Sequence, residues 1–218
     1  MNRRAIVIST AFAAIAVFAG GAAIYGGRTE QAPSARPASE QALVRMHSPV
    51  IGPASAPVTI VEFFDPSCEA CRAFYPIVKQ LLSQTRDQVR LVLRYTPLHE
   101  GSDEAARILE AARKQDRFQE VLEALLAKQS EWAVHGAPDL GKAWQIAGGA
   151  GIDLEQAKRD AVSPAVDSVL AQDVADMKAN DVRQTPTFFV NGKPLTEFSP
   201  QGLYNLVGAE LKVRQAGS

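Results

Sequence analysis

Cysteine is scarce in this sequence of 218 residues, which contains only Cys68 and Cys71. Two thiols exclude a framework of several disulfide bridges, and they are too few for a zinc or iron–sulfur site built from cysteines alone. Histidine is scarce as well, because His47, His99 and His135 stand singly with no paired spacing. We therefore expect no metal site, and we assign no role to His99 or His135.

An excess of positive charge is also missing. The chain has 23 lysines and arginines against 24 aspartates and glutamates, which gives a net charge of -1. This balance provides no basic field for a phosphate backbone, so we exclude a nucleic-acid partner. The sequence has no internal repeat, but its 46% of hydrophobic residues suffice for a core of ordinary size.

The first 25 residues have the pattern of an export signal. Arg3 and Arg4 precede an uncharged, mostly apolar run over residues 5–25. The run exceeds the usual apolar core of a signal peptide, about 7–15 residues, and approaches the roughly 20 residues that span a bilayer. A cleaved signal peptide and an uncleaved anchor over residues 1–25 both remain open. In either case, we expect the rest of the chain to be periplasmic or otherwise extracytoplasmic.

Residues 26–40 carry proline, serine and glycine but no large apolar side chain, which predicts a solvated linker. Residues 41–218 are the predicted folded domain. Within it, the short apolar runs Val58–Phe64 and Val89–Tyr95 predict two buried strands, and the segment between them has helical spacing with Ser67 as the expected N-cap. Strand, helix and strand in this order predict a βαβ unit in a parallel sheet.

The second half of the domain is predicted to be helical before it returns to strand. Residues 98–180 show apolar stripes at helical spacing, which predicts a helical insert. Thr187–Val190 then predicts a strand, Asn191-Gly192 a tight turn, and Ser199-Pro200 the start of a last helix. The chain is therefore expected to belong to the α/β class.

The sharpest chemical signal is Cys68-Glu69-Ala70-Cys71, placed where a strand turns into a helix. Backbone amides and the positive end of the helix stabilise a thiolate at Cys68, which makes it a nucleophile near neutral pH. Cys71 lies one turn further on, close enough to form and break a disulfide. A passive bridge and half of a metal site are the alternatives, but redox chemistry fits the spacing best.

The segment from Gly52 to Cys71, together with Thr185-Pro186-Thr187, resembles DsbA-family and BdbD-like thioredoxin-fold oxidoreductases. The resemblance covers nearly all of the chain after the linker. It implies a thioredoxin fold with the helical insert between a βαβ half and a cis-proline ββα half. It also implies that the disulfide itself is the redox group, without an organic cofactor.

The resemblance implies further site residues. Pro186 is expected to be cis and to face the disulfide, while the backbone of Thr185 pairs with an extended substrate. Glu62 matches a buried acid behind the cysteines; on a strand it shares a face with Ile60 and Phe64, so burial should raise its pKa. It is then expected to exchange a proton with Cys71. The alternative is a strand-edge glutamate paired with a lysine.

The chain departs from the strongly oxidising members of that family at the redox-tuning positions. They carry a histidine between the cysteines, whereas Glu69 and Ala70 stand here, and Thr185 replaces their common valine. Glu69 opposes negative charge on Cys68. We therefore expect a pKa of about 5–7 for Cys68 and a potential of roughly -150 to -220 mV, between those of DsbA and thioredoxin.

The sequence as a whole predicts an exported thiol:disulfide oxidoreductase, active as a monomer on cysteine-containing exported client proteins, with a membrane redox partner of the DsbB or DsbD type. Residues 5–25 would provide a membrane tether. One alternative is a disulfide isomerase or reductase that a membrane partner keeps reduced. Another is a non-catalytic adaptor or copper-binding protein that uses the same two thiols.

Overall fold

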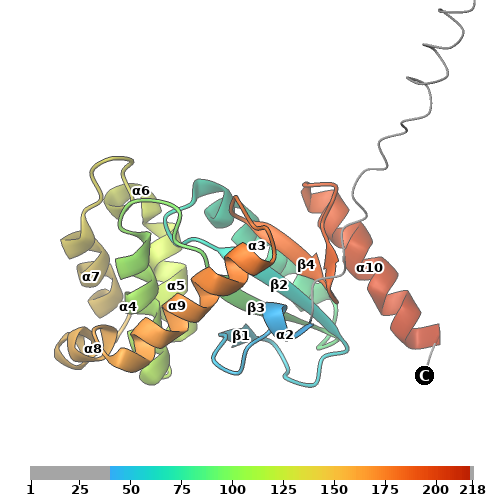
Figure 1. The fold of residues 1–218 in the computed structure, drawn as a ribbon, viewed down its shortest axis with the longest axis horizontal. Helices are drawn as coiled ribbons and strands as arrows, with labels where there is room; N and C mark the ends of the chain where they lie inside the picture. Colours follow the sequence, from blue (N-terminus) through green and yellow to red (C-terminus); the bar gives the residue numbers. More distant parts are fainter. Residues whose placement is uncertain (1–39, 217–218) are drawn as a thin grey trace, which may run out of the picture. The chain divides into compact units, whose positions relative to one another are not determined.

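A five-stranded sheet runs through the part of the chain that the computed structural model describes, residues 40–216 (Figure 1). The strands lie in the order β1-β3-β2-β4-β5. Their bounds are Val50–Ile51 for β1, Val58–Phe64 for β2, Val89–Tyr95 for β3, Thr187–Val190 for β4 and Lys193–Pro194 for β5. The three predicted strands are confirmed with the same bounds.

The sheet is mixed rather than parallel. β2 and β3 are parallel, as the βαβ pattern predicts, whereas β1 pairs with β3, β4 with β2, and β5 with β4 in antiparallel fashion. The short β1 and β5 strands carry too little sequence pattern to be recognised beforehand. The turn between β4 and β5 is the predicted Asn191-Gly192, whose positive φ angles of 47° and 81° suit these residue types.

Helices surround the sheet on both sides. Outside the insert they are α2 (Glu40–Leu43), α3 (Glu69–Gln84) and α10 (Pro200–Ala216). The insert between β3 and β4 comprises α4 (Ser102–Lys114), α5 (Phe118–Ala127), α6 (Gln129–Trp132), α7 (Leu140–Gly149), α8 (Leu154–Ala161) and α9 (Pro164–Ala179). Helices α4 to α8 gather at one end of the sheet, and α10 lies at the other (Figure 1).

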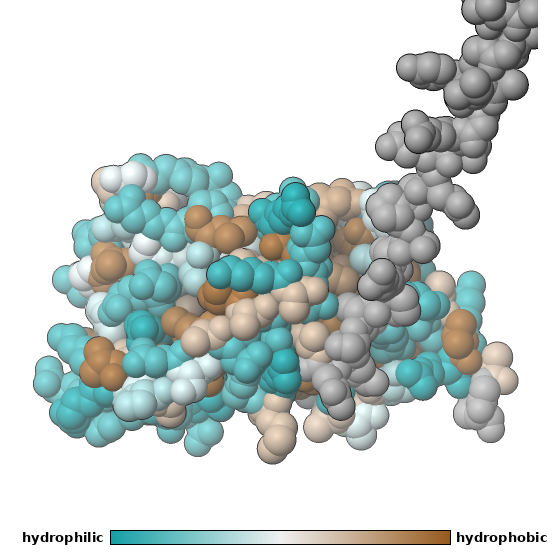
Figure 2. Space-filling view, in the orientation of Figure 1, coloured by the Kyte–Doolittle hydropathy of each residue, from teal (hydrophilic) through white to brown (hydrophobic). Residues whose placement is uncertain are grey.

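The predicted signal or anchor over residues 1–25 lies outside the described residues, as does nearly all of the predicted linker over 26–40. Among the residues that are described, no helix combines the length and the apolar character needed to cross a membrane. On the face shown in Figure 2, hydrophobic residues form separate patches among hydrophilic ones.

The two faces of the sheet are covered by different helices, because side chains alternate along a strand. Ile60 and Phe64 of β2 point into the larger core, which also holds buried side chains of α3, α10 and the insert. Val61 and Phe63 point to the opposite face, where they pack with Leu43 of α2 and with Met177 of α9. Position 62 therefore faces α3 and its cysteines.

A buried ion-pair cluster fastens α9 to the sheet. Arg94 of β3 is fully buried, and its guanidinium donates to Asp173 at 2.7 Å and to Asp176. The same side chain donates to the carbonyl oxygen of Leu43, at 2.7 Å, and so ties α2 to the cluster. Sequence periodicity places apolar residues on the inner face of α9, where Val166 and Leu170 are indeed buried, but the two aspartates are buried there as well.

We predict that Asp173→Asn lowers the free energy of unfolding by about 3 kcal/mol, because it leaves Arg94 with an incompletely balanced buried charge. Asp167→Asn is the matched control, since Asp167 lies on the same helix and pairs with Arg107 while its side chain is 56% exposed. That control should cost less than about 1 kcal/mol. Urea unfolding of both variants measures the difference. Equal losses in the free energy of unfolding would mean that the buried ion pairs stabilise the fold no more than the exposed one does.

Candidate active site

The two cysteines lie where β2 passes into α3. Cys68 is the N-cap residue of α3, and Cys71 lies in its first turn. Both are free thiols; Cys68 is 5% exposed, and Cys71 is completely buried. The prediction of Ser67 as N-cap is wrong by one residue, because the turn continues to Cys68 before the helix begins. The Ser67 hydroxyl is buried, with no hydrogen-bond partner among the described residues.

Cys68 faces the loop that leads into β4. In its thiol form, its Sγ donates to the carbonyl oxygen of Thr185 at 3.2 Å, and the peptide bond between Thr185 and Pro186 is cis, as the resemblance implies. The Thr185 hydroxyl has no other partner within the described part of the chain, so it is available to donate to a thiolate. The loop thus presents both a carbonyl and a hydroxyl to the reactive sulfur.

Hydrogen bonds lower the pKa of Cys68 to about 5. The largest contribution comes from the Cys71 thiol, and the Thr185 side chain and the backbone amides of Cys71 and Ala70 add to it, whereas burial acts in the opposite direction. At neutral pH the side chain is therefore a thiolate. The value lies at the lower end of the range that the sequence predicts.

Cys71 has the opposite character. Burial is the main cause that raises its pKa far above the usual value for a thiol, and the hydrogen bond to Cys68 and the charge of Glu62 act in the same direction. The backbone amide of Asp65 donates to its Sγ at 3.5 Å. In the reduced pair, Cys71 thus keeps its proton and donates it toward Cys68 as a hydrogen bond.

Glu62 lies beneath the cysteines on the α3 side of β2. It is 1% exposed, and neither carboxylate oxygen has a hydrogen-bond partner within residues 40–216. The alternative of a strand-edge pair with lysine is therefore wrong. Burial, followed by repulsion from the Cys68 thiolate, raises the pKa of Glu62 to about 8. The carboxyl group is able to hold or release a proton near neutral pH.

Asp65 organises the turn, and sequence reasoning missed it. It is fully buried, and its carboxylate accepts hydrogen bonds from the backbone amides of Ser67, Leu98 and His99, the His99 ring and the Ser102 hydroxyl. The carboxylate thereby ties the turn over residues 65–68, which we call the cysteine turn, to the start of α4. No local pattern signals the contact with α4, because Leu98, His99 and Ser102 lie more than thirty residues further along the chain.

Gln129 of α6 is a second positioning group that the sequence does not reveal. Its amide donates to the carbonyl oxygens of Pro66 at 2.8 Å and Cys68 at 3.0 Å, and its side chain is buried. Both bonds reach the backbone of the cysteine turn from the helical insert. The insert is therefore a structural support of the site as well as a cover.

The residues between the cysteines lie at the surface. The side chain of Glu69 is 69% exposed, so water screens its charge, and its carboxylate lies 3.9 Å from Nε2 of His135. Ala70 is half-buried and contributes its backbone amide to Cys68. No group of three or more histidine, cysteine, aspartate or glutamate side chains in the described residues is arranged to hold a metal ion.

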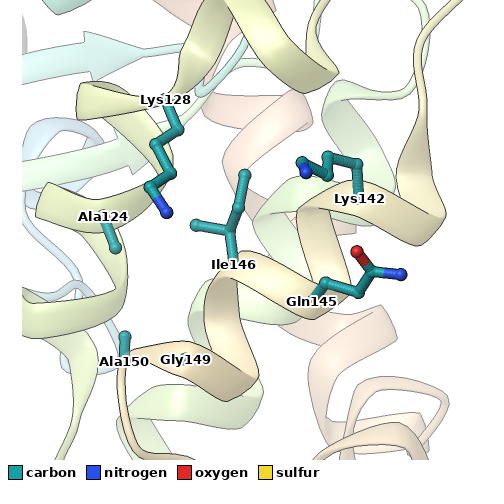
Figure 3. A pocket seen from close by; sticks show the side chains of 7 residues that line it. All are labelled: Ala124, Lys128, Lys142, Gln145, Ile146, Gly149 and Ala150. Atoms are coloured by element: carbon teal, nitrogen blue, oxygen red, sulfur yellow. The ribbon is translucent and has the colours of Figure 1, made fainter.

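Two hollows flank the cysteine turn. One, of about 250 Å³, is lined by Ser67, Leu98, His99, Val134 and His135 among others. The second, of about 340 Å³, lies along α3 and α5 and is lined mainly by apolar atoms. A third hollow, of about 220 Å³, lies between α5 and α7, where Lys128 and Lys142 flank Ile146 (Figure 3). None of its lining residues belongs to the cysteine turn.

Comparisons with known proteins agree with this geometry. A family model described as thioredoxin matches residues 45–207. A thioredoxin-like oxidoreductase from Silicibacter pomeroyi is 32% identical with a TM-score of 0.69, and the match covers 80% of this chain and 98% of that one. Oxidised BdbD from Bacillus subtilis is 26% identical with a TM-score of 0.67, over 76% of this chain and 94% of BdbD.

One protein that is similar in sequence is named as an antiporter and not as an oxidoreductase. A Na(+)/H(+) antiporter, NhaA 1 of Salinispora arenicola, is 34% identical over 170 residues, which make up 77% of this chain and 24% of the antiporter. The chain thus spans about a quarter of the length of that relative.

We predict that iodoacetamide alkylates Cys68 of the reduced protein with a rate that is half-maximal near pH 5, because the thiolate forms there. Cys71 should stay unmodified in the folded protein. Thr185→Val removes the hydroxyl while keeping the shape, so it should move the midpoint upward. Mass spectrometry between pH 3.5 and 9 follows both sites. A midpoint near the usual thiol value would contradict a stabilised thiolate.

We also predict that Glu62→Gln changes how stability depends on pH. The folded carboxyl group keeps its proton up to about pH 8, whereas the unfolded one loses it near 4.5. The reduced wild type should therefore lose stability relative to the variant as pH rises through this interval, by about 5 kcal/mol in total. Urea unfolding measures this loss, with Glu155→Gln as the control, because Glu155 is an exposed residue of α8. If the free energies of unfolding of Glu62→Gln and the wild type changed with pH in the same way, a raised pKa of Glu62 would be ruled out.

Proposed function

The chain belongs to the thioredoxin family, and we propose that it is an exported thiol:disulfide oxidoreductase acting through Cys68 and Cys71. Its fold is that of DsbA- and BdbD-like oxidoreductases. The observation that carries the proposal is the contrast between the two thiols, because Cys68 is a stabilised thiolate with 5% of its surface exposed, whereas Cys71 is a completely buried thiol beside a protonatable Glu62.

In the oxidising direction, a client thiolate attacks Sγ of Cys68 in the Cys68–Cys71 disulfide. A client–Cys68 disulfide forms, and Cys71 leaves with the electron pair and takes a proton, for which Glu62 is the nearby source. A second client thiolate then attacks the client sulfur, which forms the client disulfide and releases Cys68 as a thiolate. Two electrons pass from the client to the cysteine pair, and the low pKa of Cys68 makes it a good leaving group.

The loop at Thr185 and Pro186 is the proposed client-binding element. It faces Cys68 at hydrogen-bonding distance and leads into β4, so an extended client segment would add its backbone beside the loop in the manner of an extra strand. Apolar side chains are exposed around the turn, since Leu98 is 45%, Val134 51% and Phe198 48% exposed. Such side chains suit unfolded clients, which expose apolar residues.

We further propose that the folded domain works outside the cytoplasm as a monomer, tethered through residues 5–25 if that segment is retained. The proposal rests on the export-type pattern of residues 1–25. Cysteine-containing exported proteins would be the clients, and a membrane protein of the DsbB or DsbD type would restore the redox state. No resident cofactor is required, because the disulfide carries the two electrons.

The direction of electron flow distinguishes this function from that of an isomerase or reductase. A Cys68 thiolate with a pKa of about 5 stabilises the reduced pair and so favours an oxidase. The family resemblance instead places Thr185, the residue before the proline, with the isomerase and reductase branches. Alkylation trapping in cells decides between them. A mostly oxidised pair supports an oxidase, and a mostly reduced pair supports an isomerase or reductase.

We predict that Cys71→Ser accumulates disulfide-linked complexes with client proteins, because the nucleophile remains while the resolving thiol is lost. Cys68→Ser is the matched control; it should trap none, since its remaining thiol is buried. Non-reducing electrophoresis after acid quenching detects the complexes. If Cys68→Ser trapped clients and Cys71→Ser did not, the assigned roles would be reversed.

A further inference from the structure

His99 lies at the reactive turn although nothing in the sequence points to it. It lines the hollow of about 250 Å³ that also contains Ser67, the residue before Cys68. Its ring nitrogen Nδ1 is 2.7 Å from Oδ2 of Asp65, the buried carboxylate that holds the cysteine turn in place. His99 is thus held by the same residue, Asp65, that holds the turn carrying Cys68.

The contact with Asp65 defines how the ring takes up a proton. The Asp65 carboxylate accepts from every group that contacts it, so Nδ1 donates and the second proton binds at Nε2. The His99 side chain is 31% exposed, which lets protons reach it from solvent. The ring is therefore fixed in position by Asp65, and it still exchanges a proton with solvent.

The groups that face His99 are mainly anionic. They are Asp65, the Cys68 thiolate and Glu69, and together they outweigh burial and raise the pKa of His99 above 6.5. The His135 ring also lies next to His99, at 5.6 Å between centroids, and Glu100 follows His99 in the chain. Because coupling between two charges is mutual, the His99 cation in turn favours the thiolate, although less than the hydrogen bonds to Cys68 do.

We propose that His99 is a positioning residue for disulfide exchange: held by Asp65, its imidazolium stabilises the Cys68 thiolate when protonated and ceases to do so when neutral. The inference rests on the proposed function and adds a pH-sensitive element to it. Stabilising the thiolate stabilises the reduced pair, so the protein becomes a stronger oxidant as pH falls through the titration of His99. Here a residue outside the Cys-x-x-Cys segment provides the cation that the segment itself lacks.

The test is the equilibrium of the Cys68–Cys71 pair with glutathione at pH 6 and pH 9, for the wild type and three single variants. Comparing proteins at one pH cancels the ionisation of glutathione. His99→Asn keeps an N–H group near the Nδ1 position but carries no charge. At pH 6, it should shift the equilibrium constant about threefold toward the disulfide, and at pH 9 it should match the wild type.

The chain offers two controls and a rescue. His47→Asn is the matched control, because His47 also pairs with a buried aspartate, Asp173 of α9 at 2.8 Å, but not with the cysteine turn. It should match the wild type at both pH values, as should His135→Asn. His99→Lys keeps a positive charge at pH 9 and should preserve the oxidising equilibrium there.

Three results would overturn the proposal. They are a His99→Asn variant that equals the wild type at pH 6, a shift of the same size at pH 6 and pH 9, as a purely structural defect would give, and a His135→Asn variant that produces the shift in its place. A wild type that fails to exchange with glutathione at either pH would instead contradict the proposed function itself. The two failures are therefore distinguishable.

Discussion

Negative charge is costly in the apolar layer between β2 and α3, and the chain places three groups there that are each able to carry it. Cys68 receives the hydrogen bonds and is the group that ionises. Cys71 and Glu62 are more deeply buried, and their pKa values are raised. The site thus holds one negative charge and stores protons beneath it, which is what a nucleophilic thiol with a protonated resolving partner requires.

The surrounding fold keeps this arrangement fixed through contacts distant in sequence. Asp65 joins the cysteine turn to the start of α4, and Gln129 holds the same turn from α6. The loop at Thr185 closes the site from the β4 side. The helical insert therefore does more than enlarge the domain, because two of its helices provide groups that position the reactive backbone.

The sequence predicts those features that have a local cause. The β2 and β3 strands follow from continuous apolar runs, and the burial of Glu62 follows from alternation along β2. The roles of Asp65, Gln129 and His99 depend on contacts that form only when α4 and α6 pack on the turn, so their polar side chains look like ordinary surface residues in the sequence. The buried aspartates of α9 escape prediction for the same reason, since their partner Arg94 lies on a strand.

Turnover of a reduced, unfolded client protein is the most direct test that Cys68 and Cys71 form a catalytic pair. The wild type and Cys68→Ser are supplied with glutathione disulfide as the terminal oxidant, and the formation of client disulfides is followed over many equivalents of client. We predict repeated turnover by the wild type and only the uncatalysed rate with Cys68→Ser. Equal rates would contradict an enzymatic role and indicate that the two thiols serve in binding, as in an adaptor or a copper-binding protein.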